Sequence, residues 1–276
     1  MTADDSAVSH DAFVSIERVS KTYPTRHGDV SAVSDLSLDL RRSDFVSVLG
    51  PSGCGKTTLM LIVAGLMKRS AGSVRIDGQP VDRPYTHVGI VFQDAVLLEW
   101  RSVIDNLMLQ AEIRKLDRAA IRARSLDLLA GVGLKGFEHR HPWQLSGGMR
   151  QRVSICRALV HDPPLLLMDE PFGALDALTR DQLNLELQEM WLERRNTVMF
   201  ITHSIPEAVF LSDRVVVMSP RPGRVAAEFE IDLPRPRRLS MRETPGFGAH
   251  VRRIRSLFED WGVLHEHPLG TAMAST

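Results

Sequence analysis

Five short, largely apolar segments recur along the chain and predict the strands of a buried sheet. They span residues 45–50, 88–93, 165–170, 197–203 and 214–220, and most are separated by stretches with helical spacing. None alternates cleanly between apolar and polar residues, which is typical of parallel strands covered by helices on both faces. The pattern therefore predicts an α/β layered core.

Two other patterns frame this core. Residues 12–23, 31–40 and 72–79 alternate apolar and polar positions, which indicates half-buried antiparallel strands. Between two core strands, residues 94–160 have helical spacing and no convincing strand, so we interpret them as a helical insertion. The predicted organisation is a flexible N-terminus (1–12), a main domain (13–240, with the insertion at about 94–160), and a C-terminal helix and tail (241–276).

The C-terminal region is rich in arginine, proline and glycine. Residues 225–233 predict one more strand, and residues 233–248 predict an irregular segment. A short helix is expected after it, with Val251, Ile254, Leu257, Phe258 and Trp261 on one face. We expect a solvated face, with an anionic membrane surface as the alternative, for the arginines Arg235, Arg237, Arg238, Arg252, Arg253 and Arg255.

Composition narrows the class of protein. Of 276 residues, 43% are hydrophobic and 25% charged, as in ordinary globular proteins, and 34 basic residues balance 34 acidic ones. This balance disfavours a protein that tracks along nucleic acid. Two distant cysteines, no secretory signal pattern and no apolar run of bilayer length lead us to expect a cytoplasmic protein.

The segment after the first core strand carries the strongest chemical signal. Gly50, Gly55, Lys56 and Thr57 match the pattern G-x-x-x-x-G-K-[ST] between a strand and an apolar helix. Glycines let the backbone wrap around an anion, and the N–H groups of a helix start point at it. Lys56 is expected to bridge the β- and γ-phosphates of a nucleotide, and the Thr57 hydroxyl to ligate Mg²⁺.

Two acidic residues end another predicted strand, where "LLLMDEP" places Asp169 and Glu170. A carboxylate at the strand tip can hold Mg²⁺, so Asp169 is the candidate metal ligand. One step further, Glu170 can orient and deprotonate an attacking water. Such a pair alone often only caps a turn, but the phosphate loop strengthens the interpretation.

The stretch "LSGGMRQR" (residues 145–152) predicts a second helix start able to bind an anion. Ser146 supplies a hydroxyl, and Gly147 and Gly148 allow close approach to the backbone N–H groups. Taken alone, an ordinary serine cap with packing glycines explains it better, but the phosphate loop and the acidic strand end favour anion binding.

The ordered set of motifs resembles the ATP-binding subunit of an ATP-binding cassette (ABC) transporter over roughly residues 13–235. The resemblance implies a P-loop NTPase (RecA-like) core, an N-terminal antiparallel β subdomain and an inserted α-helical subdomain. It also implies that Tyr23 stacks on adenine, that Gln93 senses Mg²⁺ and the attacking water, and that His203 contacts the γ-phosphate. The nucleotide-binding residues implied are Tyr23, Gly50, Pro51, Ser52, Gly53, Cys54, Gly55, Lys56, Thr57, Thr58, Ser146, Gly147, Gly148 and Asp176; the catalytic ones Glu170, His203, Gln93 and Lys56; and the metal-binding ones Thr57, Gln93 and Asp169.

Partners follow from the same resemblance. It implies a head-to-tail homodimer in which each ATP, with Mg²⁺, lies between residues 50–58 of one copy and 146–148 of the other. It further implies permease subunits in the membrane, an extracytoplasmic solute-binding protein, and a place on the cytoplasmic face of the inner membrane. Residues 96–103, including Trp100, are the expected floor of the groove for the permease, with core packing as the alternative for Trp100.

Finer features are similar to the nitrate, sulfonate and taurine importer group, with two departures. Ser204 follows His203, the switch histidine of the family, at a position where many ABC proteins have an acid. Glu99 stands where proline is common. The alternative function is a soluble ABC-type ATPase acting on nucleic acid or ribosomes, but no second cassette or long insertion is present. A GTPase is disfavoured because the N-K-x-D motif is missing.

Overall fold

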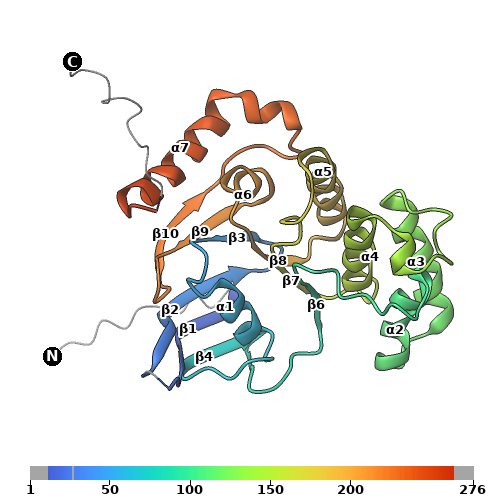
Figure 1. Cartoon of the computed structure of the whole chain (residues 1–276), viewed down its shortest axis with the longest axis horizontal. Coiled ribbons are helices and arrows are strands. Elements are labelled where there is room, and N and C mark those ends of the chain that lie inside the picture. The colour runs from blue at the N-terminus through green and yellow to red at the C-terminus, as the bar shows by residue number, and fades with distance from the viewer. Residues whose placement is uncertain (1–11, 27, 264–276) are drawn as a thin grey trace, which may run out of the picture.

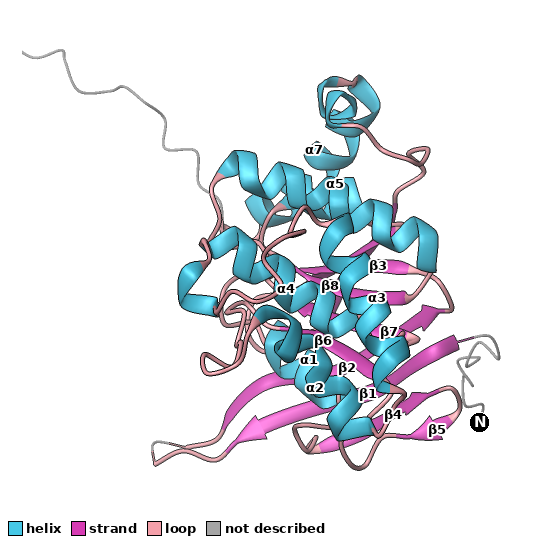
Figure 2. Ribbon diagram, turned by 90° about the vertical axis from the view of Figure 1, so that its right-hand side faces the viewer, coloured by secondary structure: helices cyan, strands magenta, loops and turns pink. Residues whose placement is uncertain are grey.

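Two β-sheets with a helix between them, and further helices outside the larger sheet, form the layers of the molecule (Figures 1 and 2). The structure is a computed structural model and describes residues 12–26 and 28–263. Nearly all of the predicted flexible N-terminus and the end of the predicted tail lie outside the described residues.

The larger sheet contains the five predicted core strands, which the structure confirms as mutually parallel where they pair. Its strand order is β10-β9-β3-β8-β7-β6, and only β10 runs antiparallel to its neighbour. Each of the five core strands ends one or two residues earlier than the pattern predicts. The strands are β3 (Phe45–Leu49), β6 (Val88–Val91), β7 (Leu165–Asp169), β8 (Thr197–Ile201), β9 (Arg214–Met218) and β10 (Val225–Glu230).

The smaller sheet is antiparallel, as the alternating segments predict, with strand order β2-β1-β4-β5. Its apolar face and one face of the larger sheet bury α1 (Lys56–Val63) between them. Val46 and Val48 of β3 belong to this layer, whereas Phe45 and Leu49 point to the opposite face. The strands are β1 (Ala12–Tyr23), β2 (Val30–Arg41), β4 (Ala71–Ile76) and β5 (Gln79–Pro80).

A group of helices lies between β6 and β7 in the chain and projects at one end of the molecule (Figure 1). Ser102, Asp117 and Ser146 accept hydrogen bonds from backbone N–H groups at the starts of its three α-helices, which satisfies donors that a helix start leaves free. The elements are α2 (Val103–Arg114), α3 (Arg118–Gly131), the 3₁₀ turn η1 (Pro142–Gln144) and α4 (Gly147–Leu159).

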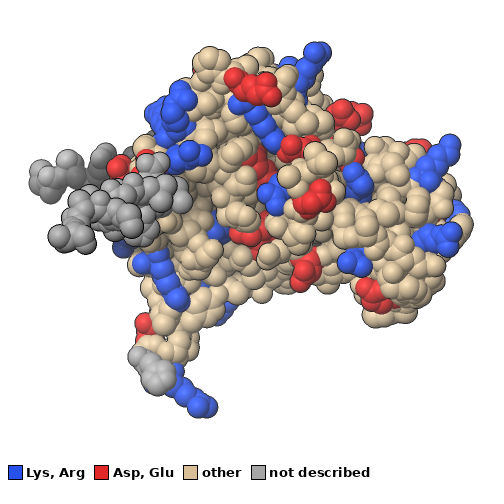
Figure 3. Space-filling view, turned by 45° about the horizontal axis from the view of Figure 1, so that its top comes forward, with Lys and Arg blue, Asp and Glu red and all other residues tan. Residues whose placement is uncertain are grey.

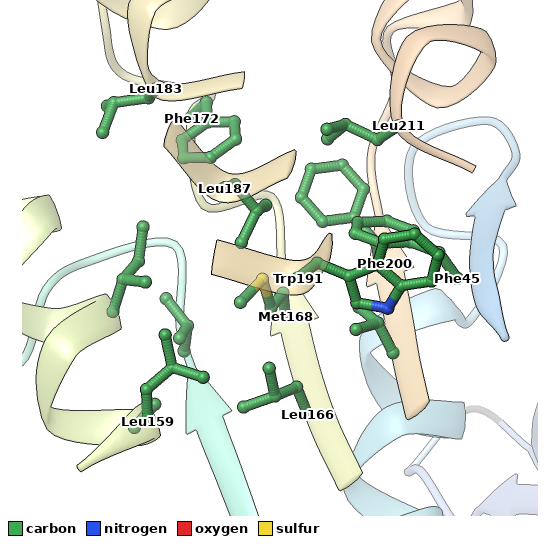
Figure 4. Close-up of a cluster of buried hydrophobic side chains, with 14 of the residues drawn as sticks. Phe45, Leu159, Leu166, Met168, Phe172, Leu183, Leu187, Trp191, Phe200 and Leu211 are labelled. Carbon is green, nitrogen blue, oxygen red and sulfur yellow. The ribbon is translucent and has the colours of Figure 1, made fainter. Parts of the chain in front are cut away.

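Three helices, α5 (Ala177–Arg194), α6 (Ile205–Leu211) and α7 (Pro245–Asp260), cover the far face of the larger sheet (Figure 1). Figure 4 shows the aromatic part of this layer, where Phe45 and Phe172 flank Phe200 with ring centroids 5.8 and 5.9 Å away. The predicted C-terminal helix is present as α7, and its own residues Ile254 and Phe258 are buried.

Two of the C-terminal arginines correct the prediction of a solvated face. Arg237 is only 1% exposed, and its Nη1 donates to the carbonyls of Val209, Phe210 and Ser212 at the end of α6. Arg235 is bound to Asp213 at 2.8 Å. The carbonyls at the end of α6 would otherwise lack hydrogen-bond partners within the helix. The bonds from Arg237 therefore hold the segment between β10 and the 3₁₀ turn η2 (Leu239–Glu243) against the core.

Candidate nucleotide-binding site

Three neighbouring strands, β3, β8 and β7, bring the phosphate loop, His203 and the acidic pair Asp169 and Glu170 to one edge of the larger sheet. They are parallel, so their carboxyl ends lie side by side. β3 leads into residues 50–55, β7 ends at Asp169, and His203 follows β8 by two residues. Open α/β sheets bind ligands at this edge of the strands.

The loop after β3 has a shape that requires glycine at its close approaches. Gly55 has a positive φ of 102°, and a Cβ there would lie 2.8 Å from both the Ala32 carbonyl oxygen and Val33 Cγ2. A side chain is excluded both by backbone conformation and by space. Gly55 directly precedes α1, so the loop ends at a helix start whose N–H groups are free to bind an anion.

Lys56 is the cation of this loop. It is buried, and its Nζ donates to the carbonyl oxygens of Gly50 and Pro51 at 2.8 and 3.0 Å. These bonds hold the ammonium at the mouth of the loop. A pocket of about 410 Å³ opens there, lined by Tyr23, Ala32, Ser52, Gly53, Gly55, Lys56, Thr57, Thr58, Gln93, Asp169, Glu170 and Arg221.

The three candidate metal ligands, Thr57, Gln93 and Asp169, share this pocket. Burial and the neighbouring Glu170 raise the pKa of the Asp169 carboxyl, while the Thr57 side chain hydrogen-bonds to it and, with Lys56, opposes the rise. A hydroxyl, a carboxylate and an amide oxygen are ligands that suit Mg²⁺. The described residues include no cluster of three or more His, Cys, Asp or Glu side chains that could hold a metal.

Glu170 and His203 face each other across the strand ends. His203 Nδ1 lies 3.1 Å from Glu170 Oε2, and the Glu170 backbone N–H donates to the Ile201 carbonyl at 2.9 Å. Glu170 adopts a positive φ of 44°, which a non-glycine residue rarely adopts. That turn directs its carboxylate away from the strand and into the pocket that Lys56 and Asp169 also line.

Two of the predicted nucleotide contacts, Tyr23 and Cys54, differ in whether the side chain lines the pocket. The Tyr23 ring lines the pocket, and its hydroxyl lies 3.3 Å from Thr58 Oγ1 and donates to the Met67 sulfur at 3.0 Å. The Cys54 side chain is 1% exposed and packs in the apolar layer between the sheets, where burial raises the pKa of its thiol. Cys54 can therefore meet a phosphate only through its backbone.

The remaining predicted contacts lie outside this pocket. Ser146 is exposed and accepts a hydrogen bond from the Met149 N–H at 3.3 Å at the start of α4. Asp176 is exposed and accepts from the Thr179 N–H at 3.0 Å at the start of α5. Hydrogen bonds from the Thr179 side chain and from its N–H lower the pKa of the Asp176 carboxyl. Gly147 and Gly148 also do not line the pocket, and Gly50 and Pro51 line an adjoining cavity.

Arg221 is a pocket residue that the sequence analysis did not find. It lies in the turn after β9, and its Nε donates to the Ser31 carbonyl at 3.2 Å. The available signal was that β9 ends at the same sheet edge as β3, which makes its following turn a neighbour of the phosphate loop. Arg221 thus adds a guanidinium to the lining of the pocket that also contains Tyr23.

A phosphate loop at the end of one strand, with a buried aspartate and a turned-out glutamate at the end of another, defines a P-loop nucleoside triphosphatase. The model of the ABC transporter family matches residues 33–173, and the chain belongs to that family. It is an ATPase, an ATP-binding cassette subunit.

Similar proteins agree with this assignment. The taurine import ATP-binding protein TauB of Rhizobium johnstonii is 48% identical over 80% of this chain and 84% of its own length. An uncharacterized ABC transporter ATP-binding protein of Methanocaldococcus jannaschii is 44% identical over 86% and 90%. Among solved structures, a dimeric cassette bound to ADP and Pi in a post-hydrolysis state is 30% identical, with a TM-score of 0.70 over 80% of this chain and all of that one.

Proposed function

We propose that this cassette works as a homodimer that couples hydrolysis of MgATP to the import of a small anionic solute, in the class of sulfonates, taurine and nitrate. The observation that carries the proposal is the convergence of Lys56, Asp169, Glu170 and His203 at one strand edge. The similarity to taurine import ATP-binding proteins supports an importer rather than an ATPase acting on nucleic acid or ribosomes.

The geometry of the pocket supports the roles that we propose for hydrolysis. The backbone of residues 50–58 and the Lys56 ammonium hold the β- and γ-phosphates, and the Tyr23 ring carries the adenine. Thr57, Asp169 and Gln93 would hold Mg²⁺, which neutralises charge on the phosphates. Glu170 accepts the proton of the attacking water, and His203, within hydrogen-bond distance of its carboxylate, contacts the γ-phosphate.

The helix start at Ser146, Gly147 and Gly148, of which Ser146 and Gly147 are exposed, supports a head-to-tail arrangement. It lies outside the pocket of its own chain but has the capped, glycine-rich form that binds anions. In the proposed dimer it covers the γ-phosphate held by the partner copy, together with Asp176. Closing the two halves excludes water, which strengthens every charge interaction in the site.

An exposed apolar surface beside Gln93 supports contact with a membrane permease. Trp100 is 74% exposed and Val96 57% exposed, which excludes core packing for Trp100, while Val103 is fully buried. Exposed tryptophan is typical of interaction surfaces. A permease in contact here, and a solute-binding protein outside the membrane, would place the cassette on the cytoplasmic face of the inner membrane.

Two observations fit this placement. No helix of the described part of the chain is both long and apolar enough to span a bilayer. Figure 3 shows basic and acidic side chains interspersed over one face, rather than a basic stripe of the kind that binds nucleic acid.

Growth of a deletion strain tests the transport function. The strain should fail to grow with taurine or an alkanesulfonate as its only sulfur source, and should grow normally on sulfate, with nitrate as sole nitrogen source as the third condition. Growth should return with the wild-type chain and not with Lys56→Ala. Normal growth on all three solutes would contradict the proposed substrate class.

A further inference from the structure

A buried glutamate lies directly behind the loop that carries His203. Glu207 is 5% exposed, and one of its carboxylate oxygens, Oε2, accepts a hydrogen bond from the hydroxyl of Thr202, which is itself buried. Burying a carboxylate is costly unless it has partners, and burial raises the pKa of the Glu207 carboxyl. Such a group needs a structural or functional reason.

Hydrogen bonds connect Glu207 to both neighbours of His203, Thr202 and Ser204. The Thr202 hydroxyl accepts from the Ser204 N–H at 3.1 Å, and Ser204 Oγ accepts from the Glu207 N–H at 3.4 Å. Residues 202 and 204 are therefore both tied to Glu207, and His203 between them has little freedom of backbone movement. Its ring reaches Glu170 at 3.1 Å from this braced position.

A second buried polar group faces the same gap. Arg180 and Glu207 both line a narrow cleft that also contains Glu170, Thr202 and His203. Among the residues that the structure describes, the buried Arg180 Nε has no acceptor and the buried Glu207 Oε1 has no donor. The nearby Arg180 charge also opposes the rise in the Glu207 pKa, so the two groups attract each other. Arg180 therefore offers a hydrogen-bond donor and Glu207 an acceptor on the same cleft.

Arg180 connects this cleft to the loop before α5. Its Nη2 donates to the Leu175 carbonyl at 3.0 Å, next to Asp176, which begins α5. A shift of that loop would move the guanidinium relative to Glu207. The arrangement links the loop of Asp176 to the loop of His203 through one buried carboxylate.

We propose that Glu207 is a positioning residue for ATP hydrolysis, which holds the loop of Thr202, His203 and Ser204 in register with Glu170 and with the Arg180 guanidinium. The inference rests on the proposed role of His203. Glu207 does not touch the nucleotide pocket, so its effect reaches the reaction only through the position of the histidine.

The test compares Glu207→Ala and Thr202→Val with Gln188→Ala. Gln188 is also buried, and Gln188→Ala removes two hydrogen bonds to the Arg237 backbone. Neither of these bonds involves residues 202–204. We expect the first two variants to lower kcat by about 10- to 100-fold, as misplaced catalytic groups do, with an unchanged Kd for ATP. Rates are divided by the concentration of ATP-binding sites, which removes any loss of folded protein, and Gln188→Ala should then match the wild type.

Two further variants separate positioning from a merely structural role. Glu207→Gln keeps an oxygen acceptor for Thr202 and should recover most of the kcat lost in Glu207→Ala. The inference is overturned if Glu207→Ala keeps the wild-type kcat per ATP site, or if Glu207→Gln is as slow as Glu207→Ala. His203→Ala is measured in parallel: wild-type kcat in that variant refutes the proposed role of His203 itself, whereas a slow His203→Ala with a fast Glu207→Ala refutes only the positioning role of Glu207.

Discussion

Two glycine-rich helix starts in this cassette are proposed to hold phosphate, yet their surroundings differ. The start of α1 lies at the strand edge, where Lys56, Asp169 and Glu170 line one pocket with it. The start of α4 has a capping serine and two glycines; Ser146 and Gly147 are exposed, and none of the three lines the pocket that contains Lys56, Asp169 and Glu170. In the proposed dimer the first region binds and activates the nucleotide, and the second covers the nucleotide held by the partner copy.

This difference shows how an ATPase can be controlled by assembly. If the partner copy supplies the missing cover, as we propose, the catalytic set of a single copy stays slow and hydrolysis depends on closure of the dimer. The chemical groups and the covering groups can then be tested separately, because they lie on different elements of the chain.

The largest expected effect is at the strand edge. Glu170→Gln removes the proposed base while keeping the shape of the side chain, so kcat should fall by about 100-fold or more. MgATP binding and dimerisation should persist, because neither the phosphate loop nor α4 changes. Steady-state phosphate release and equilibrium ATP binding measure the two quantities. Glu189→Gln, an exposed site on α5, is the control, and near-normal hydrolysis by Glu170→Gln would move the base elsewhere.

Mixing two inactive variants tests the covering role of α4. Lys56→Ala should disable the strand-edge half of a site, and Ser146→Arg the covering half, at a cost of about 1 kcal/mol in helix capping. In a mixed dimer one site combines both defects and the other has none. An equal mixture should therefore recover about a quarter of wild-type activity, as random pairing of two halves gives. Activity no higher than either variant alone would contradict complementary half-sites.

The sequence predicted the layers of this fold because each layer has its own pattern of apolar residues. Continuous apolar runs marked the parallel strands, and alternation marked the small antiparallel sheet. The ends of the strands were less accurate: β6 and β8 both stop two residues before the predicted ends. Gln93 and His203 lie in those extra residues, where the chain leaves the sheet and its side chains are free for chemistry.

Other features could not be predicted because they depend on contacts between distant residues. Arg237 is polar in sequence, but carbonyls at the end of α6 make its burial possible. Cys54 lies inside the phosphate motif, yet its side chain turns into the apolar layer. The hydrogen bonds among Thr202, Ser204 and Glu207 join residues two to five positions apart, but the burial of Thr202 and Glu207 comes from the surrounding fold, which no local motif records.

A smaller effect is expected at the exposed apolar surface beside Gln93. Trp100→Glu replaces an apolar contact with a charge, so it should reduce copurification with the permease by about tenfold, the equivalent of about 1.4 kcal/mol. The melting temperature should stay the same because the side chain is 74% exposed. Ile113→Glu, at another exposed apolar residue of the insertion, is the control. Unchanged copurification of Trp100→Glu would place the permease elsewhere.

The last expected effect is on stability alone, with none on the chemistry of the site, and it concerns His161 at the other end of the covering helix α4. His161 follows α4, and burial together with the charges of Arg114 and Arg124 lowers its pKa to about 4. The unfolded chain binds this proton near pH 6.5, so the folded state should lose stability as the pH falls from about 6.5 to about 4. Urea unfolding across this range should show a shallower loss for His161→Gln than for the wild type, with the exposed His139→Gln as control. If His161→Gln loses stability with falling pH as steeply as the wild type, protonation of His161 is not the cause of the acid destabilisation.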